Sequence, residues 1–171
     1  MIGLTKDLLA RELKAMRREV EAYPDDDAPW ILLPGWTNSG GTLALHVAGN
    51  LQHYIGAVLG ESGYVRDRDS EFTRRGIPRT ELTAELDRAA DAVGRTLDGL
   101  DPATLDHAYP LPVAGHSSVT TGGMLTHLLT HTAYHLGQID YHRRAVTGEA
   151  GGVSAVALGE LARSEAPGPL E

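Results

Sequence analysis

The sequence predicts an all-α fold, a four-helix bundle, and three observations support this prediction. Apolar residues recur at spacings of three and four in four long stretches, as on the buried face of a helix. Segments rich in Pro, Gly or charged residues separate these stretches. The chain has 171 residues, of which 42% are apolar, and this length suits one domain with a hydrophobic core.

The first predicted helix covers residues 4–22 and ends before Pro24. Its apolar stripe, which we assign to the core, consists of Leu4, Leu8, Leu9, Leu13, Met16 and Val20. The loop that follows, residues 24–39, contains Trp30 and Trp36. Side chains of this size either pin a loop to the body of a domain or form the wall of a pocket. The sequence leaves both interpretations open.

The second predicted helix covers residues 42–59, with Asn38 or Ser39 as its N-cap and Gly60 after its end. Its apolar stripe consists of Leu43, Val47, Leu51, Ile55 and Leu59. Three polar residues share a face beside that stripe, and they are His46, Asn50 and His53. Such a face fits a site built between facing helices of a bundle.

Residues 61–79 form a charged connection that contains five arginines. Its length exceeds the usual link between helices of a bundle, so it is either a long crossover or the rim of a functional site. Most of its charges suit a solvated loop with local ion pairs. The alternative is that one of these arginines binds an anionic substrate.

The third predicted helix covers residues 81–100, with Thr80 as its cap, and belongs to the core. A loop over residues 101–121 leads to the fourth helix, which has Thr121 as its cap and ends near Gly148. We therefore expect a bundle domain over residues 1–148. Residues 149–171 form a tail, with a short helix expected at 155–162.

Four of the eight histidines lie in the fourth helix, within residues 125–144. His127, His131 and His135 follow at spacings of four and line one stripe of the helix. A His-x-x-x-His pair places two imidazoles where they can share one cation, although such residues can also be solvated or hydrogen-bonded in a core. No Glu stands between His131 and His135, which argues against a metalloprotease.

Composition excludes several classes of protein. The formal net charge of −8 argues against DNA or RNA as a partner, because phosphate binding needs a basic face. The absence of cysteine excludes disulfides, thiolate nucleophiles and Cys-ligated metals. The N-terminus has no apolar signal region, and no stretch approaches the roughly 18 apolar residues of a membrane span. We expect a soluble cytoplasmic protein with no membrane partner.

The chain resembles the DinB-like superfamily, which includes YfiT-like metal-dependent hydrolases and mycothiol-dependent maleylpyruvate isomerases. The resemblance covers about residues 30–147 and rests on three motifs, NSGGTLALHVAGNLQHYIG, RDRDSEF and HLLTHTAYHLGQI. It implies a four-helix bundle of up-down-down-up order. The long link over residues 61–79 would then be the crossover between the second and third helices.

The resemblance also implies a three-histidine metal site. One ligand comes from the second helix and two come from a His-x-x-x-His pair on the last helix, which here are His46, His131 and His135. Imidazole suits zinc, nickel, copper and iron alike, so the divalent metal stays open. Three protein ligands leave a coordination position open, as a catalytic site requires.

Several polar side chains near this site have roles that the sequence leaves open. Asn50 and Gln138 lie on the histidine faces of their helices and either orient ligands or bind substrate. His127 either supports the site from one turn away or belongs to the surface. In the thiol chemistry that the resemblance implies, Arg66 or Arg68 would hold the carboxylate of the thiol.

Tyr134 is expected to pack, because it points to a different sector from His135. The sequence pattern places no acidic residue near the ligands, which weakens a hydrolase interpretation.

Two functions remain open at this stage. In the first, the chain is an enzyme whose metal acts as a Lewis acid, either in transfer of a low-molecular-weight thiol or in hydrolysis of a small-molecule substrate. Because the chain has no cysteine, the thiol would come from a cofactor such as mycothiol or bacillithiol. In the second, it is a non-catalytic metal-binding, ligand-binding or interaction protein. A homodimer fits either function.

Overall fold

Helices form the regular secondary structure of this computed structural model, which describes residues 1–112, 119–155 and 157–161. In these ranges the chain forms no strand, and one isolated antiparallel bridge joins Ala108 to Thr120. The prediction of an all-α fold is therefore confirmed. None of the described helices combines the length and the apolar composition that a membrane span needs.

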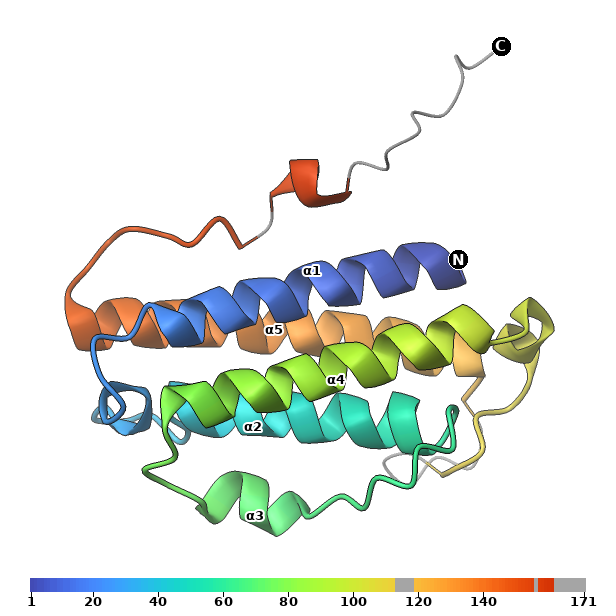
Figure 1. Cartoon of the computed structure of the whole chain (residues 1–171), viewed down its shortest axis with the longest axis horizontal. Coiled ribbons are helices and arrows are strands. Elements are labelled where there is room, and N and C mark those ends of the chain that lie inside the picture. The colour runs from blue at the N-terminus through green and yellow to red at the C-terminus, as the bar shows by residue number, and fades with distance from the viewer. Residues whose placement is uncertain (113–118, 156, 162–171) are drawn as a thin grey trace.

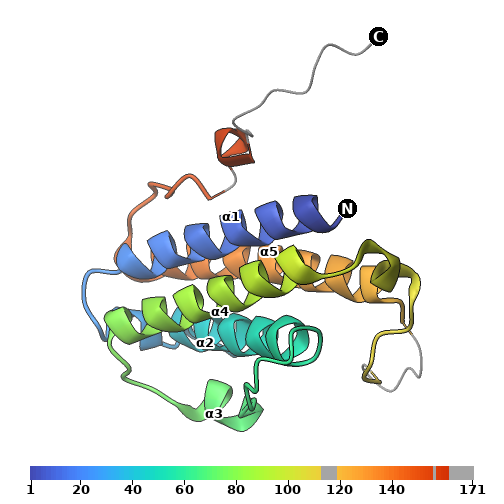
Figure 2. The ribbon, with the colours of Figure 1, turned by 45° about the vertical axis from the view of Figure 1, so that its right-hand side comes forward.

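Four long helices lie side by side, as Figures 1 and 2 show. They are α1 (Ile2–Glu21), α2 (Gly40–Leu51), α4 (Arg79–Gly99) and α5 (Thr121–Thr147). α1 and α2 each pack against both α4 and α5. In Figure 1, α2 and α4 run in one direction, and α1 and α5 run in the opposite direction. The assignment of this arrangement to the DinB-like fold stays a prediction.

The apolar stripes predicted from the sequence supply the core. From α1 the buried residues include Leu9, Leu13, Met16 and Val20, whereas Leu4 of the predicted stripe is exposed. α2 is buried along its whole length, because it lies between α4, α5 and the short helix α3. This burial brings polar residues of α2 into the interior, including His46 and Asn50.

Of the five capping positions that we predicted, three agree with the helix ends to within one residue: Ser39, Thr121 and Gly148. Gly60 does not directly follow α2, which ends at Leu51. The Ser39 hydroxyl accepts a hydrogen bond from the Thr42 N–H at the start of α2. Thr120, and not Thr121, caps α5. Gly148 ends α5 with a φ of 75°, a conformation that favours glycine. The Thr80 cap was wrong, because α4 already begins at Arg79 after Pro78.

α2 is shorter than the predicted helix over residues 42–59. It ends at Leu51, and the chain continues as a π-helical segment, Gln52–Ala57. Gly56 lies in this segment, and a Cβ there would approach the Ala92 side chain at 3.1 Å. The π-helical segment, whose turns are wider than those of an α-helix, thus lies where the chain packs closely against α4.

The charged connection over residues 61–79 contains a helix that we did not predict, α3 (Arg68–Thr73). The Asp67 carboxylate caps it by accepting from the Ser70 N–H. α3 packs against the outer face of α2 (Figure 1). Six residues are too few to produce a clear apolar period, which is why the helix was missed. Its position carries Glu71 into the interior of the protein.

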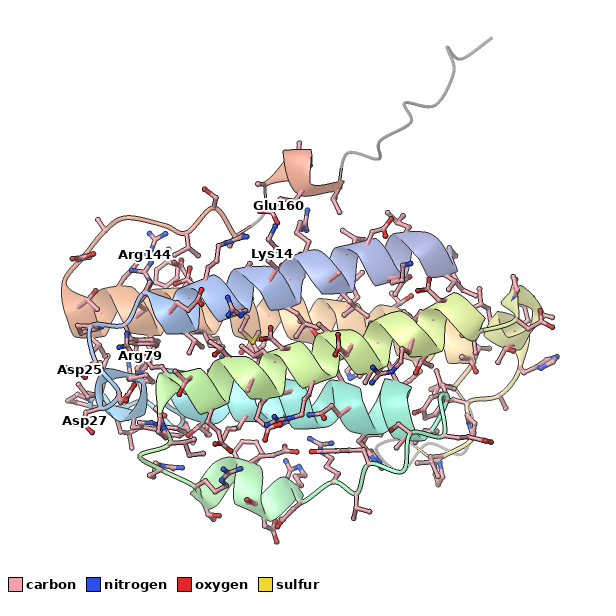
Figure 3. The ribbon with its side chains drawn as sticks, viewed as in Figure 1. Lys14, Asp25, Asp27, Arg79, Arg144 and Glu160 are labelled. Carbon is pink, nitrogen blue, oxygen red and sulfur yellow. The ribbon has the colours of Figure 1, made fainter. Side chains whose placement is uncertain are left out.

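Trp30 pins the loop between α1 and α2. Its indole N–H donates to the Ile77 carbonyl at 3.0 Å, which ties the Ala28–Trp30 turn to the start of α4. Arg79 donates to the Asp26 carboxylate in the same region, and Figure 3 shows Arg79 beside the loop that carries Asp25 and Asp27. The contact of Trp30 fits the first interpretation of the tryptophan loop, in which a large side chain pins the loop to the body of the domain.

The described part of the C-terminal segment lies on α1. A short 3-10 helix, Leu158–Leu161, falls inside the stretch where we expected a helix. Glu160 pairs with Lys14 at 3.4 Å, as Figure 3 illustrates, and Arg18 donates to the Val153 carbonyl. Residues 156 and 162–171 of the predicted tail lie outside the described residues. The division of the chain at residue 148 stays a prediction.

Candidate metal centre

Three histidines from two helices converge at the α2–α5 contact. The Nε2 atom of His131 lies 3.3 Å from Nε2 of His46 and 3.0 Å from Nε2 of His135. One ring nitrogen from each histidine lies within 4.8 Å of the others, so the group could hold a metal ion. These are the three residues that the sequence indicated.

Glu71 fixes the orientation of His46. Its Oε2 atom lies 3.0 Å from His46 Nδ1, and the carboxylate is 6% exposed. Arg66 donates to both carboxylate oxygens, at 2.7 and 2.8 Å. Burial alone would raise the pKa of Glu71, but the hydrogen bonds from Arg66 and His46 lower it below its usual value. An ionised Glu71 accepts a hydrogen bond from the Nδ1–H of His46, so the lone pair of His46 Nε2 stays available for a metal.

Gly49 provides the space for this carboxylate. It follows His46 by three residues on α2, so both lie on the same side of the helix. A Cβ at Gly49 would overlap the carboxylate of Glu71. The glycine therefore allows α3 to bring Glu71 against His46.

Gln138 performs the same task for His135. Its Oε1 atom lies 2.7 Å from His135 Nδ1, and a carbonyl oxygen can only accept. His135 therefore carries its proton on Nδ1 and presents the Nε2 lone pair. His131 differs, because its buried Nδ1 has no hydrogen-bond partner within the described ranges.

The environment of His131 and His135 favours the neutral form of both rings. Burial, followed by repulsion from His135 and His46, lowers the pKa of His131 to about 4. Burial also lowers the pKa of His135, despite its hydrogen bond to Gln138. Neutral imidazoles with converging lone pairs repel one another unless a cation lies between them. The donor set therefore fits a divalent metal ion.

The other sequence-predicted residues lie in different positions around this centre. Asn50 is 8% exposed, and its Oδ1 has no hydrogen-bond partner in the part of the chain that the structure describes. His127 is exposed, with its ring 5.8 Å from that of His131. Arg68 is exposed and lies over the Phe72 ring. Arg66 pairs with Glu71, and its Nη2 atom lies 3.4 Å from His46 Nδ1, so its guanidinium is already engaged by a carboxylate.

Two expectations about this region were wrong. We expected no acidic residue near the ligands, but Glu71 contacts His46. The two residues are 25 positions apart, and only the packing of α3 on α2 brings them together. We also expected Tyr134 to pack in the interior, but its side chain is 64% exposed.

A cavity of about 520 Å³ lies near the candidate metal centre, one helical turn from His46 and His135 along α2 and α5. Gln138, which contacts His135, forms part of its wall, and so does Trp36. Trp36 therefore lines a pocket, which was the second interpretation of the tryptophan loop.

The comparisons with known proteins give a family without an assigned activity. The profile of the DUF1572 family, described as a protein of unknown function, matches residues 4–158. No curated protein matches the sequence. The matched region includes the three converging histidines, Glu71 and Gln138. The chain thus belongs to the DUF1572 family.

Proposed function

We propose that this chain is a DinB-like metal-dependent enzyme that transfers a low-molecular-weight thiol to an electrophilic small molecule. The observation that carries the proposal is the convergence of three histidine Nε2 atoms beside a cavity. A divalent ion bound there would act as a Lewis acid and lower the pKa of a coordinated thiol.

The surroundings of Glu71 favour thiol transfer over hydrolysis. A hydrolase usually needs a carboxylate that can accept a proton from water. Both oxygens of Glu71 already accept hydrogen bonds from Arg66 and His46, which commits this carboxylate to positioning a ligand. A thiol has an ordinary pKa near 8.5, much lower than that of water, so it needs less help to lose its proton.

The thiol would come from solution, because the chain contains no cysteine. A cofactor such as mycothiol or bacillithiol carries amide and hydroxyl groups as well as its sulfur. The buried Asn50 Oδ1, on the histidine face of α2, is an acceptor for one of these donors. Glu71 and Gln138 would hold the imidazoles of His46 and His135 in place meanwhile.

The metal site is tested first. Untagged protein, purified without a nickel column and reconstituted with zinc, is analysed by elemental mass spectrometry. Wild type and His127→Ala should bind one zinc per chain, and His131→Ala should lose it. His127→Ala is a matched control, because it removes an exposed histidine one turn from His131. Zinc binding that is equal in all three proteins contradicts the site.

Turnover is tested next with bacillithiol and 1-chloro-2,4-dinitrobenzene. In this reaction the sulfur bonds to the ring carbon, chloride leaves, and the thiol proton passes to the buffer. Zinc-loaded wild type and His127→Ala should form the thioether faster than the uncatalysed reaction in buffer, whereas His131→Ala should not. Release of nitrophenol from p-nitrophenyl acetate without thiol would favour the hydrolase instead. Zinc binding without either reaction would favour a non-catalytic metal-binding protein.

A further inference from the structure

The cavity beside the histidines follows the groove between α2 and α5. The chain order of the contacts shows that the two helices run antiparallel here. Gly40 lies next to His142, whereas His46 lies next to His131 and His135. Residues nearer the start of α2 therefore lie beside residues nearer the end of α5.

The cavity begins within one helical turn of the metal ligands. Leu43 precedes His46 by three residues on α2, and Gln138 follows His135 by three residues on α5. Three residues correspond to about 4.5 Å along a helix. Both residues line the cavity, and the side chain of Gln138 also contacts His135, so the wall of the cavity reaches a metal ligand through Gln138.

Aromatic rings form the outer part of the cavity. Trp36, Tyr134 and Tyr141 all line it, and their side chains are 38%, 64% and 68% exposed. Large rings usually gain from burial, so three of them around one hollow indicate a surface that a ligand covers. The volume of about 520 Å³ lies within the range of small-molecule sites.

Gly137, which also lines the cavity, leaves this part of the wall open. It lies inside α5, where glycine weakens a helix relative to alanine. Close packing does not explain it, because a Cβ there would meet no atom within 4 Å. A glycine at this position in the wall keeps the cavity open, because a larger side chain would enter it.

The side chains that line the cavity indicate which class of ligand it fits. Among the described residues, none that lines the cavity carries a formal charge, so a charged group there would lose hydration without gaining an ion pair from the wall. The amides of Asn38 and Gln138 offer hydrogen bonds to a polar substituent. Edge-to-face and stacked contacts favour a flat aromatic ring.

We propose that this cavity binds an uncharged aromatic group of the electrophilic substrate, one helical turn from the metal ligands. This inference rests on the proposed function for the identity of the reaction. Binding of the aromatic group needs only the cavity, so the two can be tested separately.

The binding test uses 2-naphthol, which is uncharged at pH 7, and its anionic relative 2-naphthoate. In isothermal titration calorimetry, zinc-loaded wild type should bind 2-naphthol about tenfold more tightly than 2-naphthoate. Gly137→Leu should weaken the binding of 2-naphthol by about tenfold or more, because the new side chain occupies the cavity. Tyr141→Ala, which removes one aromatic wall, should weaken it in the same direction.

Gly94→Leu is the matched control. Gly94 also lies inside a long helix, and a Cβ there would meet no atom within 4 Å, but it does not line the cavity. Both substitutions should preserve or raise the melting temperature. Gly94→Leu should bind 2-naphthol as wild type does. Undetectable binding to wild type, or equal loss in both glycine variants, would overturn the inference.

The metal-free His131→Ala protein separates this inference from the proposed function. Binding of 2-naphthol to it supports the cavity even when no thiol transfer is found in any protein. The converse result is transfer activity in wild type together with a KM for 1-chloro-2,4-dinitrobenzene that is the same in Gly137→Leu. That result would support the enzyme and contradict the aromatic site. The aliphatic electrophile iodoacetamide should show the same KM in wild type and Gly137→Leu.

Discussion

At the scale of single residues, the candidate metal centre depends on one partner from another helix, Glu71, and on one from the same helix as its histidine, Gln138. Glu71 comes from α3 and Gln138 from α5, and each accepts a hydrogen bond from the Nδ1–H of one histidine. These contacts decide which nitrogen is available for a metal. The histidine residues alone do not decide it, because either ring nitrogen can be protonated.

Loss of the Glu71 carboxylate should weaken metal binding without abolishing it. In Glu71→Gln we expect about 10- to 100-fold lower zinc affinity, as for other partners of metal-bound histidines. Competition with a chromophoric chelator measures this affinity. Glu81→Gln, on the exposed start of α4, is the control and should bind zinc normally. Equal affinities in all three proteins would refute the role of Glu71.

Gly49→Ala should reproduce the effect of Glu71→Gln, because its Cβ would displace the carboxylate from His46. We expect a reduction in zinc affinity of about tenfold or more in the same titration. Alanine is also a better helix former, so a loss of helix propensity cannot cause the change. Wild-type affinity in this variant would show that Glu71 adjusts without leaving His46.

At the scale of elements, the ends of α5 and the loop before α2 show how local signals and long-range contacts differ. Gly148 ends α5 through its own left-handed conformation, a local effect that the sequence already indicated. The loop over residues 24–39 is held by distant partners. Tyr23 donates to His142 Nδ1 at 2.6 Å, and His142 Nε2 donates to the Ile31 carbonyl at 2.8 Å.

Gly148→Ala should destabilise the protein by about 1 kcal/mol, because alanine at this φ is strained. Gly94→Ala, inside α4, should instead stabilise it by about 0.5–1 kcal/mol. Urea unfolding followed by circular dichroism measures both changes. A destabilised Gly94→Ala protein would contradict the open space seen around Gly94.

The burial of His142 should make the stability depend on pH. Burial lowers the pKa of His142, so its ring is neutral in the fold and binds a proton more readily after unfolding. This contribution is complete above the unfolded pKa of about 6.5, and it is lost as the pH falls toward the lower folded value.

The comparison of wild type with His142→Gln isolates that contribution. The difference in unfolding free energy between the two proteins should be larger at pH 7.5 than at pH 5. Urea titrations with a chelator present avoid changes that come from metal release. A difference that stays constant between these pH values would contradict a neutral, buried His142.

At the scale of the whole molecule, a buried ion pair joins the first and last long helices. Arg143 of α5 donates to Glu19 of α1 at 2.5 Å, and both side chains are almost fully buried. A second nitrogen of Arg143 donates to the Gly151 carbonyl. One residue thus connects α1, α5 and the segment that follows α5.

Glu19→Leu should cost about 3–5 kcal/mol, because it removes the buried partner of the Arg143 guanidinium and leaves it with the longer contact to Asp140. The double variant Glu19→Leu/Arg143→Leu should cost clearly less than the sum of the two single changes. Equilibrium unfolding in urea provides the three values of the cycle. Additive losses would indicate that the two charges do not interact.

The sequence by itself determined the helices and the histidines. Apolar spacing indicated α1, α2, α4 and α5, because each long helix must bury one face. The spacing of His131 and His135 placed two imidazoles on one face for the same geometric reason.

The tertiary structure decided what surrounds those histidines. Helix α3 is too short for a periodic signal, and Glu71 meets His46 only because α3 packs on α2. The aromatic cavity likewise needs Trp36, Leu43 and Tyr141, which come from a loop and two helices. Contacts between distant segments depend on how helices pack together, and local periodicity carries no information about that packing.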